Sequence, residues 1–186
     1  IDIDFSAVIE RSDGSMLRNL SFINMLLSNF LIIGLWHLVV FFMCLRMPLA
    51  SFNPSKGRFV QKDWERGGLW YRDKLKIQVW KDKLPQYIGK SGFSKKHLNG
   101  LSIDYIDRFI EETCRGEWMH MKNCICSIII LIINPLLVGL VTSFFIVLGN
   151  LPFAIVQRYN RFRLQILRKR RIRELQGGNV RENTVT

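Results

Sequence analysis

Three acids, an arginine and a histidine lie close together in the stretch EETCRGEWMH (111–120). On a helix, Glu117 and His120 are one turn apart on the same face. A histidine beside a carboxylate can act as a general base, with its tautomer set by that acid. We therefore predict His120 as a catalytic base, with Glu117 and Glu112 as the accompanying catalytic carboxylates. The alternative is a set of solvated charges in local ion pairs, each contributing a few tenths of a kcal/mol, roughly.

A second polar group combines amide, phenol and guanidinium side chains, a mixture that suits a phosphate-bearing donor or a sugar headgroup. Arg115 has the planar fork that binds phosphate or carboxylate through two hydrogen bonds. The predicted substrate- and donor-binding residues are Arg115, Lys81, Asp82, Gln157, Arg158, Tyr159, Asn160 and Arg161.

His37 stands inside an apolar run, where an ionisable side chain is a functional candidate. A neutral imidazole that bonds another membrane segment explains it equally well, so its role stays open.

Two apolar runs must position these residues. Cys124–Gln157 contains no charged residue and exceeds the roughly 20 residues of one membrane crossing. Asn134-Pro135 is a turn dipeptide within it, which predicts a transmembrane hairpin. Leu20–Leu45 is long enough for a further span. The fold class is therefore mainly α, an integral membrane protein with about three transmembrane segments.

The regions on both sides of the hairpin are rich in Lys and Arg, which favours the cytoplasmic face for each. We expect a multi-pass protein of the cell membrane with cytoplasmic basic regions. Ser102 is the expected cap of an amphipathic helix that leads into the hairpin. Period-two alternation at 74–79 predicts a short strand or extended segment. Residues 1–15 precede Met16 and are interpreted as an upstream remnant. The predicted segments are 1–19, a span at 20–45, a basic aromatic interfacial segment at 46–101, the helix and hairpin at 102–157 and a basic C-terminal helix and tail at 158–186.

The net charge of +12 fits anionic lipid headgroups better than nucleic acid, because no nucleic-acid-binding motif is present. Membrane lipids are thus expected partners and nucleic acid is not. The four cysteines form no C-x-x-C pair, which favours free thiols over a disulfide or metal site. The sequence indicates no oligomeric state.

Four motifs occur in order along the chain: RMP (46–48), WY followed by WKDKLP (70–85), ETCRGEWMH (112–120) and NLPFAIVQRYNRFRL (150–164). In these motifs, residues 36–172 resemble the glycosyl-4,4'-diaponeurosporenoate acyltransferase family, small bacterial membrane proteins of carotenoid biosynthesis. Two features depart from the family pattern. Phe162 replaces a proline, and the hairpin turn is the bare Asn134-Pro135.

The resemblance implies transfer of a fatty acyl group to the sugar 6-hydroxyl of a glycosylated C30 carotenoid acid. Acyl-CoA is the expected donor substrate, a glycosylated terpenoid or glycolipid is the expected acceptor, and no cofactor is expected. In this reaction His120 would be the base, oriented by Glu117, and Arg115, Lys81 or Arg158 would hold a donor phosphate or the oxyanion. The alternatives are a small membrane lipid methyltransferase or reductase, whose arginine–glutamate tail signature is absent here, and a non-catalytic lipid-binding subunit.

Overall fold

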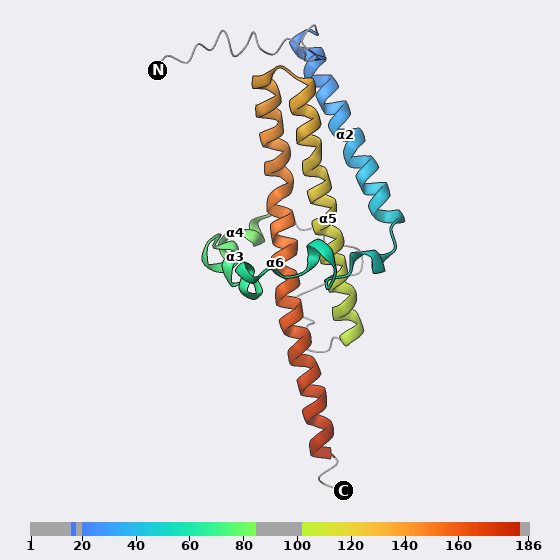
Figure 1. Ribbon diagram of the computed structural model, residues 1–186, viewed down its shortest axis with the longest axis vertical. Helices are drawn as coiled ribbons and strands as arrows, with labels where there is room; N and C mark the ends of the chain where they lie inside the picture. Colours follow the sequence, from blue (N-terminus) through green and yellow to red (C-terminus); the bar gives the residue numbers. More distant parts are fainter. Residues whose placement is uncertain (1–15, 18–19, 85–101, 183–186) are drawn as a thin grey trace. The chain divides into compact units, whose positions relative to one another are not determined.

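Three long helices dominate a computed structural model that describes residues 16–17, 20–84 and 102–182 (Figure 1). They are α2 (Phe22–Arg46), α5 (Ile103–Ile133) and α6 (Leu136–Glu182). By length and composition, all three are apolar enough to cross a membrane. The described residues contain no strand. The predicted mainly α fold with about three membrane helices is confirmed. The predictions for the N-terminal remnant at 1–15 and for the part of the interfacial segment at 85–101 concern residues outside the described part of the chain.

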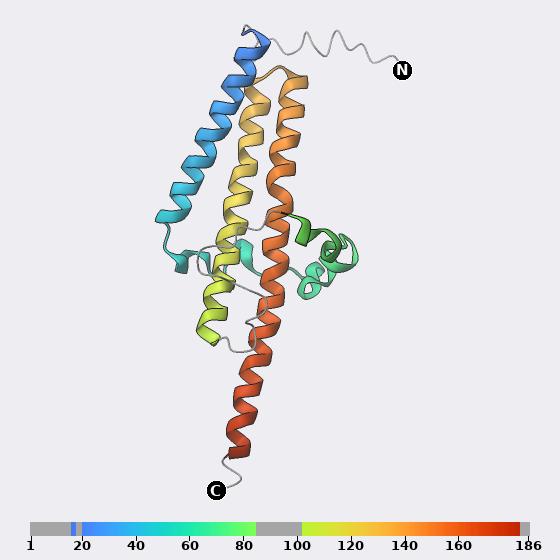
Figure 2. The same cartoon turned by 180° about the vertical axis from the view of Figure 1, so that it is seen from behind.

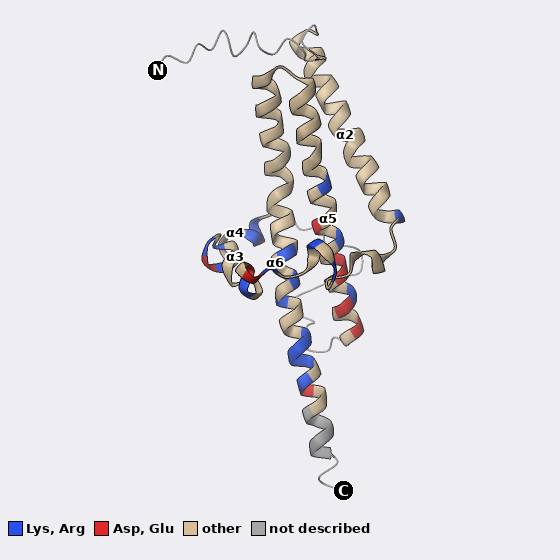
Figure 3. Ribbon diagram, in the orientation of Figure 1, with Lys and Arg blue, Asp and Glu red and all other residues tan. Residues whose placement is uncertain are grey.

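The chain divides into two compact units. We call residues 1–47 with 118–154 the apolar unit and residues 48–117 with 155–186 the basic unit. The apolar unit contains α2, the second half of α5 and the first part of α6, which lie side by side in both views (Figures 1 and 2). In Figure 3 these helical segments are almost free of charge. The chain turns at Asn134-Pro135, between α5 and α6.

A pair of buried amides fastens α2 to that turn. Asn29 and Asn134 exchange two hydrogen bonds, each 2.9 Å long, and the Asn134 amide also donates to the carbonyl of Ile130 at 2.8 Å. Both side chains are nearly inaccessible. An amide without such partners would be costly in a hydrocarbon environment. The pair therefore selects one register between the two segments.

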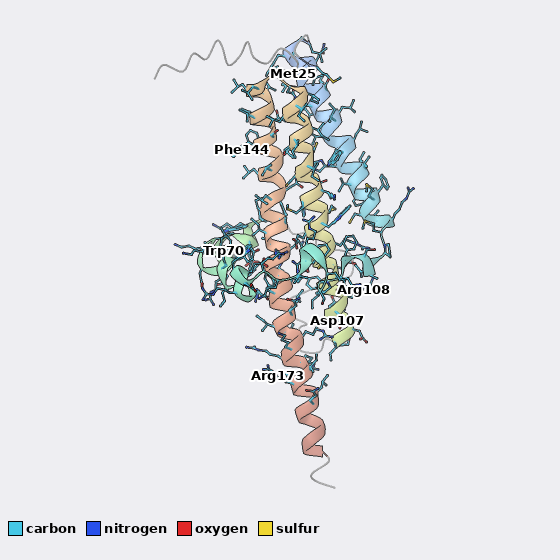
Figure 4. All side chains as sticks on the ribbon, viewed as in Figure 1. Met25, Trp70, Asp107, Arg108, Phe144 and Arg173 are labelled. Atoms are coloured by element: carbon cyan, nitrogen blue, oxygen red, sulfur yellow. The ribbon has the colours of Figure 1, made fainter. Side chains whose placement is uncertain are left out.

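Apolar packing completes the inner side of this unit. Its buried core is Cys126, Ile130 and Ile146, against which Ile32, Ile33, Trp36 and Ile133 pack. The Trp36 indole donates to the carbonyl of Lys122 at 3.0 Å. The outer side is also apolar, as the outward Phe144 in Figure 4 illustrates with 61% of its surface exposed. Apolar residues on both sides are expected of helices surrounded by lipid.

The basic unit contains the first part of α5, the second part of α6 and a series of short helices. These are η1 (Leu49–Phe52), η2 (Gly57–Phe59), η3 (Asp63–Gly68), α3 (Leu69–Asp73), α4 (Ile77–Trp80) and η4 (Lys81–Lys83). Their shared core with α6 consists of Tyr71, Ile77, Val156, Tyr159 and Phe162. Gly68 has φ +93°, and a Cβ there would lie 3.2 Å from Phe162 Cβ. Glycine thus allows this close approach to α6.

Within the basic unit, the beginning of α5 packs against α6. Ile106 and Ile110 of α5 pack with Leu164 of α6. Next to them, Arg168 Nη2 donates to Asp107 Oδ2 at 2.9 Å, and its Nε donates to Oδ1. The predicted cap is confirmed, since Ser102 Oγ accepts from the backbone N–H of Tyr105 at 3.3 Å. Figure 4 labels Asp107 on α5 and Arg173 farther along α6.

The predicted strand or extended segment at 74–79 is wrong. Lys76 takes a left-handed conformation with φ +46°, and α4 begins at the next residue. The Trp80 indole donates to the carbonyl of Leu75 at 2.9 Å and closes the bend. Ile77 is fully buried in the core, whereas Val79 is exposed. Alternation needs a neighbouring strand to supply hydrogen bonds, and no strand occurs in the described residues.

The predicted boundary between the hairpin and the tail at 157/158 does not interrupt the helix. α6 continues through it to Glu182. Phe162 is buried at 1% exposure and stands within this continuous stretch. α6 also contains Pro152, which lacks the backbone N–H that a helix residue donates four residues back, and the helix remains unbroken there.

Candidate functional site

Arg158 of α6 is held by partners on all sides within the basic unit. Its Nε and Nη2 donate to the two carboxylate oxygens of Glu65, the latter at 2.8 Å, and its Nη1 donates to Glu117 Oε1 at 3.1 Å. The carbonyls of Arg58 and Val60 accept from Nη1 at 2.9 Å and from Nη2 at 3.0 Å. An arginine has five N–H donors, and these five bonds use them. We predicted Arg158 as a residue that binds the acyl donor. All of its N–H groups are instead used in hydrogen bonds within the protein, and it acts as an internal clamp.

Glu65 is the fully buried carboxylate of this cluster, and the sequence reasoning missed it. The Tyr71 hydroxyl donates to its Oε1 at 2.5 Å, and the backbone N–H of Lys62 donates to its Oε2 at 2.6 Å. Burial works to raise the pKa of Glu65, but the bonds from Arg158, Tyr71 and Lys62 outweigh it, so the net pKa is lowered. Burial and the bond to Glu65 raise the pKa of Tyr71. Glu65 is therefore ionised and Tyr71 is neutral at pH 7.

The lowered pKa of Glu65 predicts a dependence of stability on pH. Because its folded pKa lies below the ordinary value of 4.5, the stabilisation is present above that value and lost as pH falls through the folded pKa. We expect Glu65→Gln to unfold at a lower temperature than wild type at neutral pH. The difference should narrow as pH falls toward about 3. Thermal unfolding of the purified protein in detergent, followed by circular dichroism, measures it.

Asp73→Asn is the matched control for this prediction, because the Arg72–Asp73 pair also lowers a carboxyl pKa but is exposed to solvent. Exposed pairs contribute little to stability. A constant gap between Glu65→Gln and wild type across the pH range would contradict the prediction.

Glu117 of α5 links Arg158 to a second arginine. Its Oε2 accepts from Arg161 Nη1 at 2.6 Å, and the same nitrogen lies 3.3 Å from Cys114 Sγ. Arg161 is completely buried, with its guanidinium 5.7 Å from the Phe59 ring centre. Its Nε and Nη2 have no hydrogen-bond partner in the described part of the chain. Arg161 therefore retains hydrogen-bonding capacity for an anion or a carbonyl oxygen.

The other predicted binding residues are dispersed over the basic unit. Glu112 pairs with Arg115 at 3.2 Å, and Arg115 lies over the Phe52 ring. Lys81 is buried and pairs with Asp82 at 2.7 Å. Further along α6, the hydroxyl of buried Tyr159 accepts from Gln78 at 3.1 Å, Gln157 lies against Gly116, and Asn160 is half-buried.

His120 belongs to the apolar unit, where its partner comes from the other arm of the hairpin. Its Nδ1 lies 3.2 Å from Asn150 Oδ1, and its ring stacks on Phe153 with 5.1 Å between ring centres. The prediction that Glu117 orients His120 is therefore wrong. The two charged guanidinium groups occupy both Glu117 oxygens, and they are stronger donors than a neutral imidazole. The sequence signal for Asn150 was an amide inside an apolar run.

His37 of α2 has a local partner, since its Nδ1 lies 2.8 Å from the carbonyl of Ile33. Among the residues described, no group of three His, Cys, Asp or Glu could hold a metal ion. The cysteines Cys44, Cys114, Cys124 and Cys126 are free thiols, as predicted.

Comparison with known proteins assigns the family. Residues 55–170 match the family model described as glycosyl-4,4'-diaponeurosporenoate acyltransferase. The chain belongs to this family. Relatives of that name from Staphylococcus aureus strains MRSA252 and bovine RF122 are each 33% identical over 126 residues, covering 66% of this chain and 76% of theirs. No solved structure matches the chain significantly.

Membership makes the chain an acyltransferase, which sets aside the methyltransferase, reductase and non-catalytic alternatives. The family match includes the Glu65–Arg158–Glu117–Arg161 cluster, His120 and Asn150. It does not include α2, which carries His37. In this glycosyl-4,4'-diaponeurosporenoate acyltransferase family member, the polar cluster and His120 thus lie in the matched region, and His37 lies outside it.

Proposed function

We propose that this acyltransferase moves a fatty acyl group from acyl-CoA to a sugar hydroxyl of a glycosylated carotenoid acid. The names of the family and of its relatives support the acceptor and the reaction class. The observation that carries the proposal is His120, a half-buried imidazole bonded to Asn150 among apolar helices. A base in such surroundings can meet a substrate whose long polyene prefers lipid and whose sugar is polar.

The proposed chemistry is nucleophilic attack assisted by a general base. His120 accepts the hydroxyl proton as the sugar oxygen attacks the thioester carbonyl carbon. A C–O bond forms, and collapse of the tetrahedral intermediate breaks the C–S bond. The coenzyme A thiolate leaves and takes up the proton from the imidazolium, so that charge and atoms balance and His120 is regenerated.

The basic unit is proposed to bind the donor. Arg161 is its strongest candidate, because two of its buried N–H groups have no partner in the described residues. Arg115 and Lys81 remain candidates for the donor phosphates, and Arg158 is assigned to the clamp with Glu65 and Glu117. We further propose that both basic regions face the cytoplasm, where a soluble acyl-CoA is available.

The direct test incubates the purified protein in detergent with acyl-CoA and glycosyl-4,4'-diaponeurosporenoate, with mass spectrometry to detect the acylated product. Formation of the ester and release of free coenzyme A in equal amounts are expected. An acyl carrier protein thioester is the parallel donor. Ester formed only from the acyl carrier protein thioester would overturn the acyl-CoA assignment. If neither donor gives ester, the proposed reaction is overturned.

A further inference from the structure

We propose that His120, His37 and Asn123 form a binding site for the hydroxyl groups of a neutral sugar within the apolar unit, with Asn150 as the positioning residue of His120. The proposal rests on the proposed function and names the side chains that would recognise its acceptor.

The orientation of Asn150 determines the tautomer of His120. Asn150 Nδ2 donates to the backbone carbonyl of Ile146 at 3.0 Å. A carbonyl oxygen can only accept, so the amide nitrogen must face it and Oδ1 must face His120. Nδ1 of the neutral imidazole therefore carries the hydrogen, and its Nε2 carries the lone pair. Nε2 is the atom that can accept a hydroxyl proton.

His37 is fixed in the same tautomer by another carbonyl. Its Nδ1 lies 2.8 Å from the carbonyl oxygen of Ile33, so this nitrogen is the donor and Nε2 is again an acceptor. The bond from Trp36 to the carbonyl of Lys122 holds α2 against α5 beside both histidines. Two basic nitrogens are thus presented in one part of the apolar unit.

Asn123 adds a third acceptor, one helical turn after His120. Only 6% of its surface is exposed, and its Oδ1 is buried without a hydrogen-bond partner among the described residues. Buried amide oxygens are normally bonded, because an unbonded one keeps the cost of losing water. A ligand that donates a hydrogen bond would satisfy it.

The charges of the unit select the class of ligand. Three acceptor atoms repel an anion, since its own oxygens offer only lone pairs. A cation finds no counter-ion, because residues 20–47 and 118–154 contain no acid, whereas Lys122 lies in the unit. A neutral group with several hydroxyls can donate to all three atoms. Among the parts of the proposed substrates, the sugar of the acceptor has that chemistry.

Binding without a donor tests the site separately from catalysis. Quenching of tryptophan fluorescence would report the affinity for glycosyl-4,4'-diaponeurosporenoate and for 4,4'-diaponeurosporenoate, which lacks the sugar. Wild type should bind the glycosylated compound at least about tenfold more tightly. Asn123→Leu should lose most of that preference without weakening binding of the sugar-free compound, and His37→Leu should act in the same direction.

Ser143→Ala is the matched control, because it removes a polar side chain of the same unit whose bond, to the carbonyl of Ser127, is internal. It should keep the wild-type preference. Equal binding of both compounds by wild type would overturn the site, and so would an Asn123→Leu variant that keeps the full preference. Neither result depends on acyl transfer, so failure of the site and failure of the proposed reaction are distinguishable.

The role of Asn150 has its own readout. Asn150→Leu should lower kcat about tenfold or more while KM for acyl-CoA stays unchanged, because the imidazole is no longer held in the reactive tautomer. Asn150→Asp keeps an oxygen acceptor for Nδ1–H and should restore much of kcat. Equal losses in Leu and Asp variants, or a loss expressed only in KM, would overturn the positioning role.

Discussion

His120→Asn is expected to lower kcat by about 10²–10⁴-fold, the usual contribution of a general base. The asparagine amide can still donate to Asn150 Oδ1 from a position close to that of Nδ1, but it has no basic nitrogen. The bond across the hairpin would remain while proton transfer is lost. Product formation by purified protein at saturating acyl-CoA and acceptor measures the effect, with the amount of folded protein checked by gel filtration in detergent.

His120→Gln provides the complementary substitution, because its amide reaches toward the position of Nε2 and cannot act as a base. If both variants lose activity to a similar degree, the basic nitrogen is required. If His120→Asn keeps full activity, then the imidazole serves only to hold Asn150, and the proposed mechanism loses its base. Ser143→Ala should retain wild-type kcat in the same assay.

Glu117→Leu is expected to destabilise the fold by about 3–5 kcal/mol, the usual cost of removing one partner from a buried charge cluster. Glu117 lies between Arg158 and Arg161, at 3.1 and 2.6 Å. Without it, Arg161 loses its carboxylate partner, and Arg158 keeps Glu65 as its one remaining carboxylate partner among the described residues. Two guanidinium groups would then be buried with one carboxylate. A fall in the free energy of unfolding, from thermal or denaturant unfolding in detergent, measures the loss.

Glu174→Gln is the matched control, since Glu174 pairs with Arg171 on α6 at 3.1 Å but is largely exposed. An exposed pair of this kind contributes at most about 1 kcal/mol. The double variant Glu117→Leu with Arg161→Met should be more stable than Glu117→Leu alone, because it removes one unpaired buried charge. Similar small effects of Glu117→Leu and Glu174→Gln would contradict the assignment of Glu117 as the centre of the cluster.

The sequence by itself determined the long helices of this protein and the turn between two of them. Hydrophobic length marked the helices α2 and α6, the Asn134-Pro135 dipeptide marked the turn, and Ser102 marked the start of α5. These features depend on neighbours within a few residues, and local chemistry decides them. The same reasoning failed at 74–79, where alternation indicated a strand but no strand partner exists in the described residues.

Only the tertiary structure decided which polar groups meet. Helical spacing predicted Glu117 and His120 on the same face of one helix. In the structure, both oxygens of Glu117 accept hydrogen bonds from Arg158 and Arg161, which are 41 and 44 residues away in the sequence. His120 instead met Asn150, 30 residues away, and Glu65 met Arg158, 93 residues away. A buried polar side chain pairs with the strongest donor or acceptor that packing brings within reach. That choice depends on which helices pack together, and residue spacing along one helix does not contain it.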